Sequence, residues 1–129
     1  MAFECRVECD SISPEGERFP LPGPEDYAGE FDRLQTLAAA ERARGREIVV
    51  VVGVGFVGAV MAGVIADSVD RKSGKPGKFV IGMQRPSTRS FWKIPTLNRG
   101  VAPVTSEDPE VATLIERCVN RKKTLTVTY

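Results

Sequence analysis

The stretch EIVVVVGVGFVG, residues 47–58, decides the fold of this chain. Its first half is an unbroken apolar, β-branched run after Glu47, which predicts a strand buried on both faces inside a parallel sheet. Its second half is a G-x-G-x-x-G loop, and a segment with helical periodicity opens inside that loop. One apolar stripe of the predicted helix is formed by Val57, Val60, Met61, Val64 and Ile65.

In a dinucleotide-binding site, each of the three glycines of this loop is required for a different physical reason. Gly53 permits a tight turn, Gly55 lets the backbone approach a pyrophosphate, and Gly58 lets the helix pack closely on the strand. The start of the helix offers unpaired N–H groups and roughly half a positive charge, which attract a diphosphate. The contiguous strand, loop and helix therefore predict dinucleotide binding. The alternative is a glycine-rich buried turn without a ligand.

Elements after the loop complete an α/β pattern. Residues 78–83 are predicted as a second strand after a polar turn, and residues 124–128 as a third. Between them a helix is predicted from Pro109, capped by Ser106 or Asp108. The expected fold is a partial Rossmann-type parallel sheet of about three strands with flanking helices.

An N-terminal extension, residues 1–46, precedes the domain predicted for residues 47–129. It contains a helix expected from Pro24 to a stop at Gly45. Prolines before that helix predict a linker, in which residues 5–9 could add one edge strand. Whether the extension covers the outer edge of the first strand stays open. The apolar stripe of the predicted helix is Tyr27, Phe31, Leu34 and Ala38.

The end of the second strand is where a dinucleotide-binding sheet carries an acid for the adenosine ribose. This chain has Gln84 there, followed by Arg85. A glutamine can hydrogen-bond a diol but lacks the charge that repels a 2′-phosphate, and an arginine attracts one. The residues therefore leave the choice between NAD and NADP open. They also leave open the alternative that both are exposed loop residues.

A second motif, KIPTLNRGVAP at residues 93–103, follows the second strand. With the glycine loop it resembles the UDP-glucose/GDP-mannose dehydrogenase family, where a basic residue, Leu-Asn-x-Gly and Pro stand at this place. An acidic residue then leads into a helix, as Glu107 does here. Family members oxidise the C6 alcohol of a nucleotide sugar to a carboxylate in two NAD-dependent steps. They hold the aldehyde stage on a cysteine nucleophile.

The resemblance, which extends over about residues 47–129, implies the roles of individual residues. The three glycines and the backbone between them would hold the NAD pyrophosphate, and Gln84 would stand at the position of the ribose-binding acid. Lys93 falls on a basic position that can reach the adenosine side, while Phe91 and Trp92 beside it are expected to pack. The predicted cofactor-binding residues are Gly53, Val54, Gly55, Phe56, Val57, Gly58, Gln84, Arg85 and Lys93.

No catalytic residue is predicted within the chain. The family's nucleophile belongs to a later domain, and neither Cys5, Cys9 nor Cys118 matches it. Cys118 lies on an apolar helical stripe and is expected in the core. Cys5-x-x-x-Cys9 lacks a second pair of ligands, so no metal site is expected.

Composition narrows the remaining classes of function. Lys and Arg total 18 and Asp and Glu 17, so no basic excess indicates nucleic acid or an anionic membrane as a partner. The longest apolar run is broken by glycines and falls short of the roughly 20 residues that span a bilayer. With three cysteines, no histidine and no signal-like start, a reducing cytoplasmic setting is expected.

The sequence thus predicts the NAD-binding N-terminal part of a nucleotide-sugar 6-dehydrogenase, inactive by itself. A nucleotide-sugar substrate would be bound only in a longer chain, and a homo-oligomer is possible. Two alternatives stay open: a stand-alone nucleotide-binding module without redox activity, and a fragment of another Rossmann oxidoreductase. The Leu-Asn-x-Gly motif at residues 97–100 favours the first hypothesis over the last.

Overall fold

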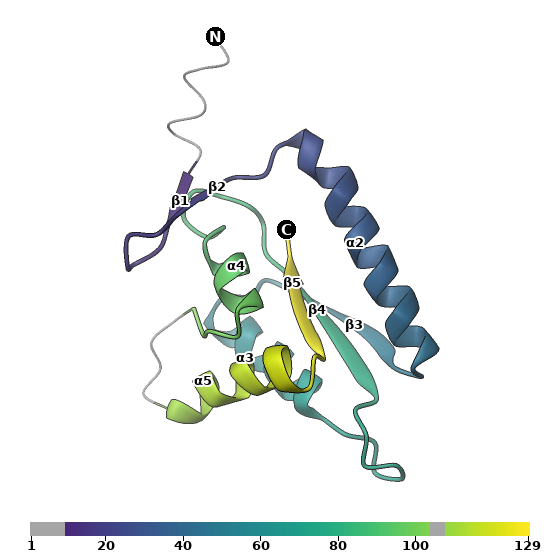
Figure 1. Ribbon diagram of the computed structural model, residues 1–129. Coiled ribbons are helices and arrows are strands. Elements are labelled where there is room, and N and C mark those ends of the chain that lie inside the picture. Colours follow the sequence, from purple (N-terminus) through teal and green to yellow (C-terminus); the bar gives the residue numbers. More distant parts are fainter. Residues whose placement is uncertain (1–9, 104–107) are drawn as a thin grey trace.

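A three-stranded parallel sheet forms the centre of the computed structural model, which describes residues 10–103 and 108–129 (Figure 1). The strands lie in the order β3 (Glu47–Val52), β4 (Lys78–Met83) and β5 (Leu125–Thr128). Both neighbouring pairs are parallel. The chain therefore has the α/β, partial Rossmann-type fold that the sequence predicts.

Helices cover the two faces of this sheet. α3 (Phe56–Asp67) connects β3 to β4, whereas α4 (Lys93–Asn98), α5 (Pro109–Glu116) and the π-helix η1 (Arg117–Arg121) connect β4 to β5. The N-terminal helix α2 (Pro24–Ala43) lies on the opposite side of the sheet from α3 and α5 (Figure 1). The segments 24–43, 47–52, 78–83 and 125–128 thus form as predicted. Neither α4 nor the π-helical end of α5 is predicted from the sequence.

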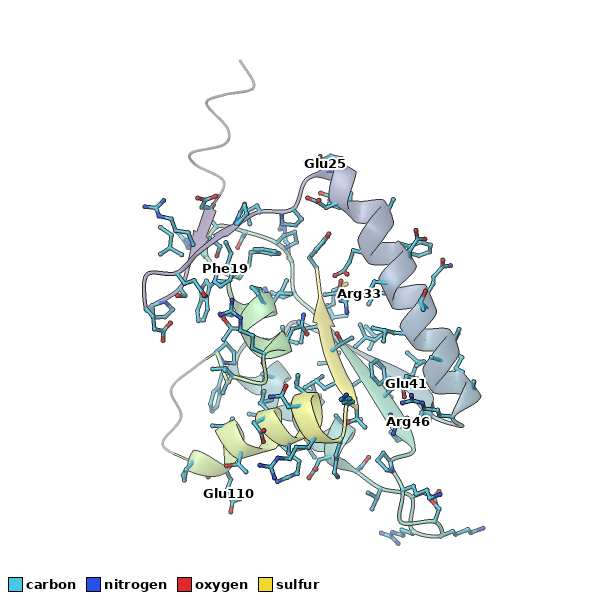
Figure 2. All side chains as sticks on the ribbon, viewed as in Figure 1. Phe19, Glu25, Arg33, Glu41, Arg46 and Glu110 are labelled. Atoms are coloured by element: carbon cyan, nitrogen blue, oxygen red, sulfur yellow. The ribbon has the colours of Figure 1, made fainter. Side chains whose placement is uncertain are left out.

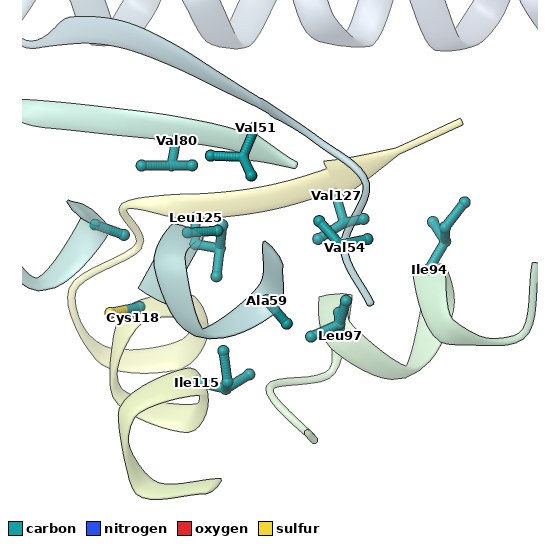
Figure 3. Packing of buried hydrophobic residues seen from close by; sticks show 12 residues of the cluster. Val51, Val54, Ala59, Val80, Ile94, Leu97, Ile115, Cys118, Leu125 and Val127 are labelled. Atoms are coloured by element: carbon teal, nitrogen blue, oxygen red, sulfur yellow. The ribbon is translucent and has the colours of Figure 1, made fainter. Parts of the chain in front are cut away.

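The core lies between the sheet and the helices α3, α4 and α5. Val51, Val80 and Val127 reach it from the three strands. Figure 3 shows them above the side chains of Leu97 and Ile115. Fully burying a side chain of this size stabilises the fold by about 1.5–3 kcal/mol. Cys118 is fully buried in the same cluster, as its place on the helical stripe predicts.

The buried side of α3 differs from the predicted stripe, which is wrong at three positions. Val57, Met61 and Val64 are exposed. Small residues face the sheet and α5 instead, because the helix approaches both closely. A Cβ atom on Gly63 would lie 3.0 Å from a side-chain carbon of Leu114. The buried positions of α3 are Ala59, Ala62, Gly63 and Ala66.

An ion-pair cluster holds the end of α3 against η1. Asp67 pairs with Arg117 at 2.9 Å and with Lys122 at 2.8 Å. Hydrogen bonds from these two cations lower the pKa of Asp67 to about 2. The lysine also donates to the Asp67 carbonyl at 2.8 Å. The cluster is partly exposed, so its contribution to stability is modest.

Polar contacts tie α2 to the other face of the sheet. Arg33 donates to Oγ1 of Thr126 at 3.0 Å and to the Val127 carbonyl at 3.3 Å. Figure 2 labels Arg33 between α2 and β5. Glu30 accepts from the Thr128 hydroxyl at 2.8 Å. These residues turn a charged side of the helix toward β5. The predicted apolar stripe of α2 is therefore wrong at Tyr27 and Phe31, which are exposed.

Strand β3 is also less buried than predicted. Val51 is 8% exposed on the α3 side, but Val50 and Val52 are 56% and 72% exposed on the α2 side. The expectation of burial on both faces is wrong because β3 is an edge strand and α2 bonds to β5, at the opposite edge.

An unpredicted hairpin precedes α2. β1 (Asp10–Ile12) and β2 (Arg18–Pro20) pair antiparallel, and the Ser11 hydroxyl accepts from the Trp92 N–H at 2.9 Å. Glu17 in the hairpin turn accepts two hydrogen bonds from Arg99, each 2.9 Å long. The extension is therefore anchored on α4. The strand proposed for residues 5–9 lies outside the described residues.

Across the described ranges, none of the helices has the length and apolar character needed to cross a membrane.

Candidate functional site

The glycine loop lies between the carboxyl end of β3 and the amino end of α3. Gly53 has φ +87°, a conformation that side chains disfavour, and its N–H donates to the Met83 carbonyl at 2.7 Å. The loop thus turns sharply directly beside the end of β4. In the described part of the chain, the N–H groups of Phe56, Val57 and Gly58 have no acceptor. Those donors and the helix dipole make the loop suited to an anion.

The other two glycines of the loop have opposite surroundings. A Cβ atom on Gly58 would lie 1.7 Å from the Gly53 carbonyl oxygen, so this position is closed by backbone. A Cβ atom on Gly55 would meet nothing within 4 Å. Gly58 is therefore required by packing. Gly55 instead leaves an open approach to the start of the helix, where a pyrophosphate is predicted. Nucleotide binding by the loop stays a prediction.

Gln84, at the end of β4, contacts the loop directly. Its side-chain Oε1 accepts from the Val54 N–H at 3.1 Å, and its own N–H donates to the Thr128 carbonyl at 2.9 Å. Val54 is almost fully buried over β4. Gln84 therefore joins the glycine loop to the second strand, a contact that the sequence does not reveal.

Gly82 makes room for this arrangement and is missed by the sequence reasoning. A Cβ atom there would lie 2.7 Å from Cγ1 of Val54. A glycine inside a strand is a known signal for such a close approach, so its position in the second strand could have indicated the contact. Gly82 and Gln84 together determine how the loop lies on the sheet.

The segment after Gln84 forms a hydrogen-bonded loop that leads to α4. The Ser90 hydroxyl donates to the Arg85 carbonyl at 3.0 Å, and the Trp92 indole donates to the Arg89 carbonyl at 2.8 Å. Lys93 lies with its Nζ 5.9 Å from the centre of the Trp92 ring. Trp92 is buried and Phe91 packs on the core, as expected. Arg85 is exposed.

The Leu-Asn-x-Gly motif has a structural explanation. Leu97 is buried in the core. Asn98 brackets the outer edge of β5, accepting from the Val127 N–H at 2.8 Å and donating to the Val127 carbonyl at 2.9 Å. Gly100 has φ +83° directly after α4. The motif therefore packs α4 against β5 and occupies the outer backbone groups of that edge strand. The sequence of the motif alone does not show this role.

The described cysteine is unsuited to nucleophilic catalysis. Cys118 is fully buried, and its Sγ lies 3.5 Å from the Gly63 carbonyl. Burial raises the pKa of its thiol, which disfavours the reactive thiolate. Cys5 and Cys9 lie outside the described residues.

Comparison with solved structures finds one related dehydrogenase. The chain is similar to the crystal structure of NDP-N-acetyl-D-galactosaminuronic acid dehydrogenase from Methanosarcina mazei Go1, with 32% identity and a TM-score of 0.55. The match covers 71% of this chain and 18% of that protein. No family model matches the chain. No curated protein sequence matches it either. The structural neighbour supports a relationship to nucleotide-sugar dehydrogenases.

Proposed function

We propose that this chain is the dinucleotide-binding part of a nucleotide-sugar dehydrogenase, with NAD or its 2′-phosphorylated form as the cofactor. The observation that carries the proposal is the open space at Gly55, at the start of α3. Beside it lie the N–H groups of Phe56 and Val57, which have no acceptor among the described residues. At Gly58, by contrast, the backbone of Gly53 fills the space. This is the arrangement that receives a pyrophosphate in dinucleotide-binding sheets. The M. mazei dehydrogenase supports the enzyme class. A cytoplasmic setting is part of the same proposal.

The roles of the loop residues differ within this proposal. Backbone N–H groups of Phe56 and Val57 bind the pyrophosphate, and Gly55 allows it to approach. Gln84 holds the loop in position through Val54. Arg85 and Lys93 lie on the adenosine side. The cofactor would accept a hydride from the sugar alcohol in the complete enzyme.

A glycine substitution tests the binding site without disturbing the fold. Gly55→Val adds a side chain whose Cβ meets nothing within 4 Å, and the Gly55 backbone is extended (φ −68°, ψ −159°) and does not lie in the left-handed region that favours glycine. We expect NAD(H) to shift the amide resonances of Gly55, Phe56 and Val57 in the wild-type chain, and Gly55→Val to abolish these shifts. Gly29→Ala is the matched control, because a Cβ there also meets open space but lies on α2.

The outcome that contradicts the proposal is specific. A folded wild-type chain whose loop amides stay unchanged with both NADH and NADPH does not bind a dinucleotide at this loop. Equal binding by wild type and Gly55→Val would place the ligand elsewhere.

We also propose that the chain alone does not oxidise nucleotide sugars. Binding a cofactor without positioning a substrate forgoes a proximity contribution of roughly 7–11 kcal/mol to the barrier. The test is NADH formation, followed by absorbance, with UDP-glucose, GDP-mannose and dTDP-glucose. Turnover that survives Cys→Ser substitution of Cys5, Cys9 and Cys118 would contradict both the inactivity and the assignment of a cysteine mechanism to another part of the enzyme.

A further inference from the structure

The orientation of the Gln84 carboxamide determines what its free end can bind. An N–H group can only donate, so the contact with Val54 fixes Oε1 toward the loop. The group left for a ligand is the Nε2 amide, which is a pure donor. An acid at this position would offer acceptors to ribose hydroxyls and would repel a phosphate. Gln84 does neither.

The loop after Gln84 is rich in donors and cations. Residues 84–93, QRPSTRSFWK, contain three cationic side chains and three hydroxyls but no carboxylate. The loop has a defined shape, because the Ser87 and Ser90 hydroxyls lie 2.7 Å apart and Ser90 donates to the Arg85 carbonyl. It follows directly from the strand end at which adenosine ribose is bound in such sheets.

Two arginines of this loop have uncommitted guanidinium groups. Arg85 and Arg89 are exposed, and neither has a carboxylate or carbonyl partner among the residues that the structure describes. By contrast, Arg46 and Arg117 elsewhere in the chain pair with carboxylates at 2.6 and 2.9 Å. A planar guanidinium without a partner is suited to bidentate binding of phosphate.

We propose that the adenosine end of this site is built for a 2′-phosphate, so that the chain binds NADP(H) in preference to NAD(H). The inference rests on the proposed dinucleotide function and sharpens it. Nε2 of Gln84 and the guanidinium of Arg85 donate to the 2′-phosphate, while Arg89 adds positive charge from the same loop. The absence of a carboxylate from residues 84–93 removes the repulsion that would otherwise exclude this phosphate.

Paired titrations test this preference in the folded 129-residue chain. Dissociation constants for NADH and NADPH are measured by calorimetry at one fixed salt concentration, with AMP and adenosine 2′,5′-bisphosphate as fragments. We expect NADPH and the bisphosphate to bind at least about tenfold more tightly than NADH and AMP, which lack only the 2′-phosphate. Arg85→Ala should remove most of that ratio, and Gln84→Asp should reverse it.

Arg71→Ala is the matched control, since Arg71 is an exposed arginine in the turn before β4, at the other end of the sheet. It should leave the ratio unchanged. NADH binding as tightly as or more tightly than NADPH overturns the inference but leaves the proposed function intact. A ratio that falls equally in Arg71→Ala and Arg85→Ala overturns it too, because it would reflect net charge alone. Binding of neither dinucleotide contradicts the proposed function and this inference with it.

Discussion

The two edges of the sheet are finished in different ways. At the β5 edge, the side chain of Asn98 pairs with both backbone groups of Val127, and Arg33 donates to the same carbonyl. At the β3 edge, the structure described here provides no such partner. Glu47 and Gly53 turn their N–H groups toward the β4 side. The backbone groups of the even-numbered residues therefore point outward, along with exposed side chains on the α2 side.

The β5 edge is therefore closed by side chains of this chain, whereas the β3 edge is open and can pair with a further strand. A short strand bracketed by an asparagine presents little for another chain to pair with. An apolar edge with free N–H and carbonyl groups is a template for a further strand. Val50 and Val52, exposed on the α2 side of β3, lie on that template. The glycine loop follows this open edge directly, so whatever pairs with β3 also borders the proposed cofactor site.

The largest expected effect on stability concerns Leu97, which supports the closed β5 edge of the sheet. Leu97 is buried beneath β5 and begins the motif that carries Asn98. Leu97→Ala should lower the free energy of unfolding by about 2–5 kcal/mol, through lost burial and a cavity. Urea denaturation followed by circular dichroism measures this. A loss below about 1 kcal/mol would show that α4 does not pack on the sheet as described.

Asn98→Ala should have the next largest effect, because it leaves the Val127 N–H without its acceptor, while the Val127 carbonyl keeps only its bond from Arg33. We expect a loss of about 1–3 kcal/mol, the cost of leaving one buried N–H group unsatisfied. Asn120→Ala is the control, since that side chain makes a single bond, to the Arg99 carbonyl, at an exposed site. Equal losses in both variants would mean that Asn98 does not close the β5 edge.

The prediction of these regions from sequence succeeded where local chemistry decided the outcome. The β-branched run, the glycine loop and the proline-initiated helices α2 and α5 all form where their residues indicate. Burial was harder to predict, because it depends on which element reaches which face. α3 packs through alanines and a glycine since it lies close to the sheet, and α2 turns Glu30 and Arg33 toward β5. No local pattern encodes those choices.

The site was predictable to a similar degree. The three loop glycines could be identified from the sequence, because each meets a local requirement of the backbone. The contact from Gln84 to Val54 joins residues 30 positions apart, and it depends on the room left at Gly82. The pairing of Asn98 with Val127 likewise depends on a turn that brings α4 beside β5. Such long-range contacts follow from the assembled fold alone.

A comparison within β3 should give a smaller but sharper difference. Val51 is 8% exposed and its neighbour Val50 is 56% exposed. Val51→Ala should cost about 1.5 kcal/mol, from the loss of two buried carbon groups, whereas Val50→Ala should cost at most about 0.5 kcal/mol. Both values come from the same denaturation series. Similar costs would show that the α2 side of β3 is covered in solution.

The substitution with the smallest expected effect on stability, Val50→Lys, tests whether the open β3 edge pairs with another strand. Val50→Lys places a charge on the exposed side of β3 without removing buried contacts, so the free energy of unfolding should change by no more than about 0.5 kcal/mol. A lysine on an edge strand disfavours pairing with another strand, since its charge would have to be desolvated in the new sheet. We therefore expect Val50→Lys to lower concentration-dependent self-association, measured by sedimentation velocity.

Val101→Lys makes the same chemical change at a side chain that is 53% exposed after α4, away from β3, and should leave association unchanged. If both lysines lower association alike, added charge explains the effect and the edge does not. If the wild-type chain stays monomeric at high concentration, the outward groups of β3 are not a template for a second copy. The difference between the two edges would then matter only for strands of another chain.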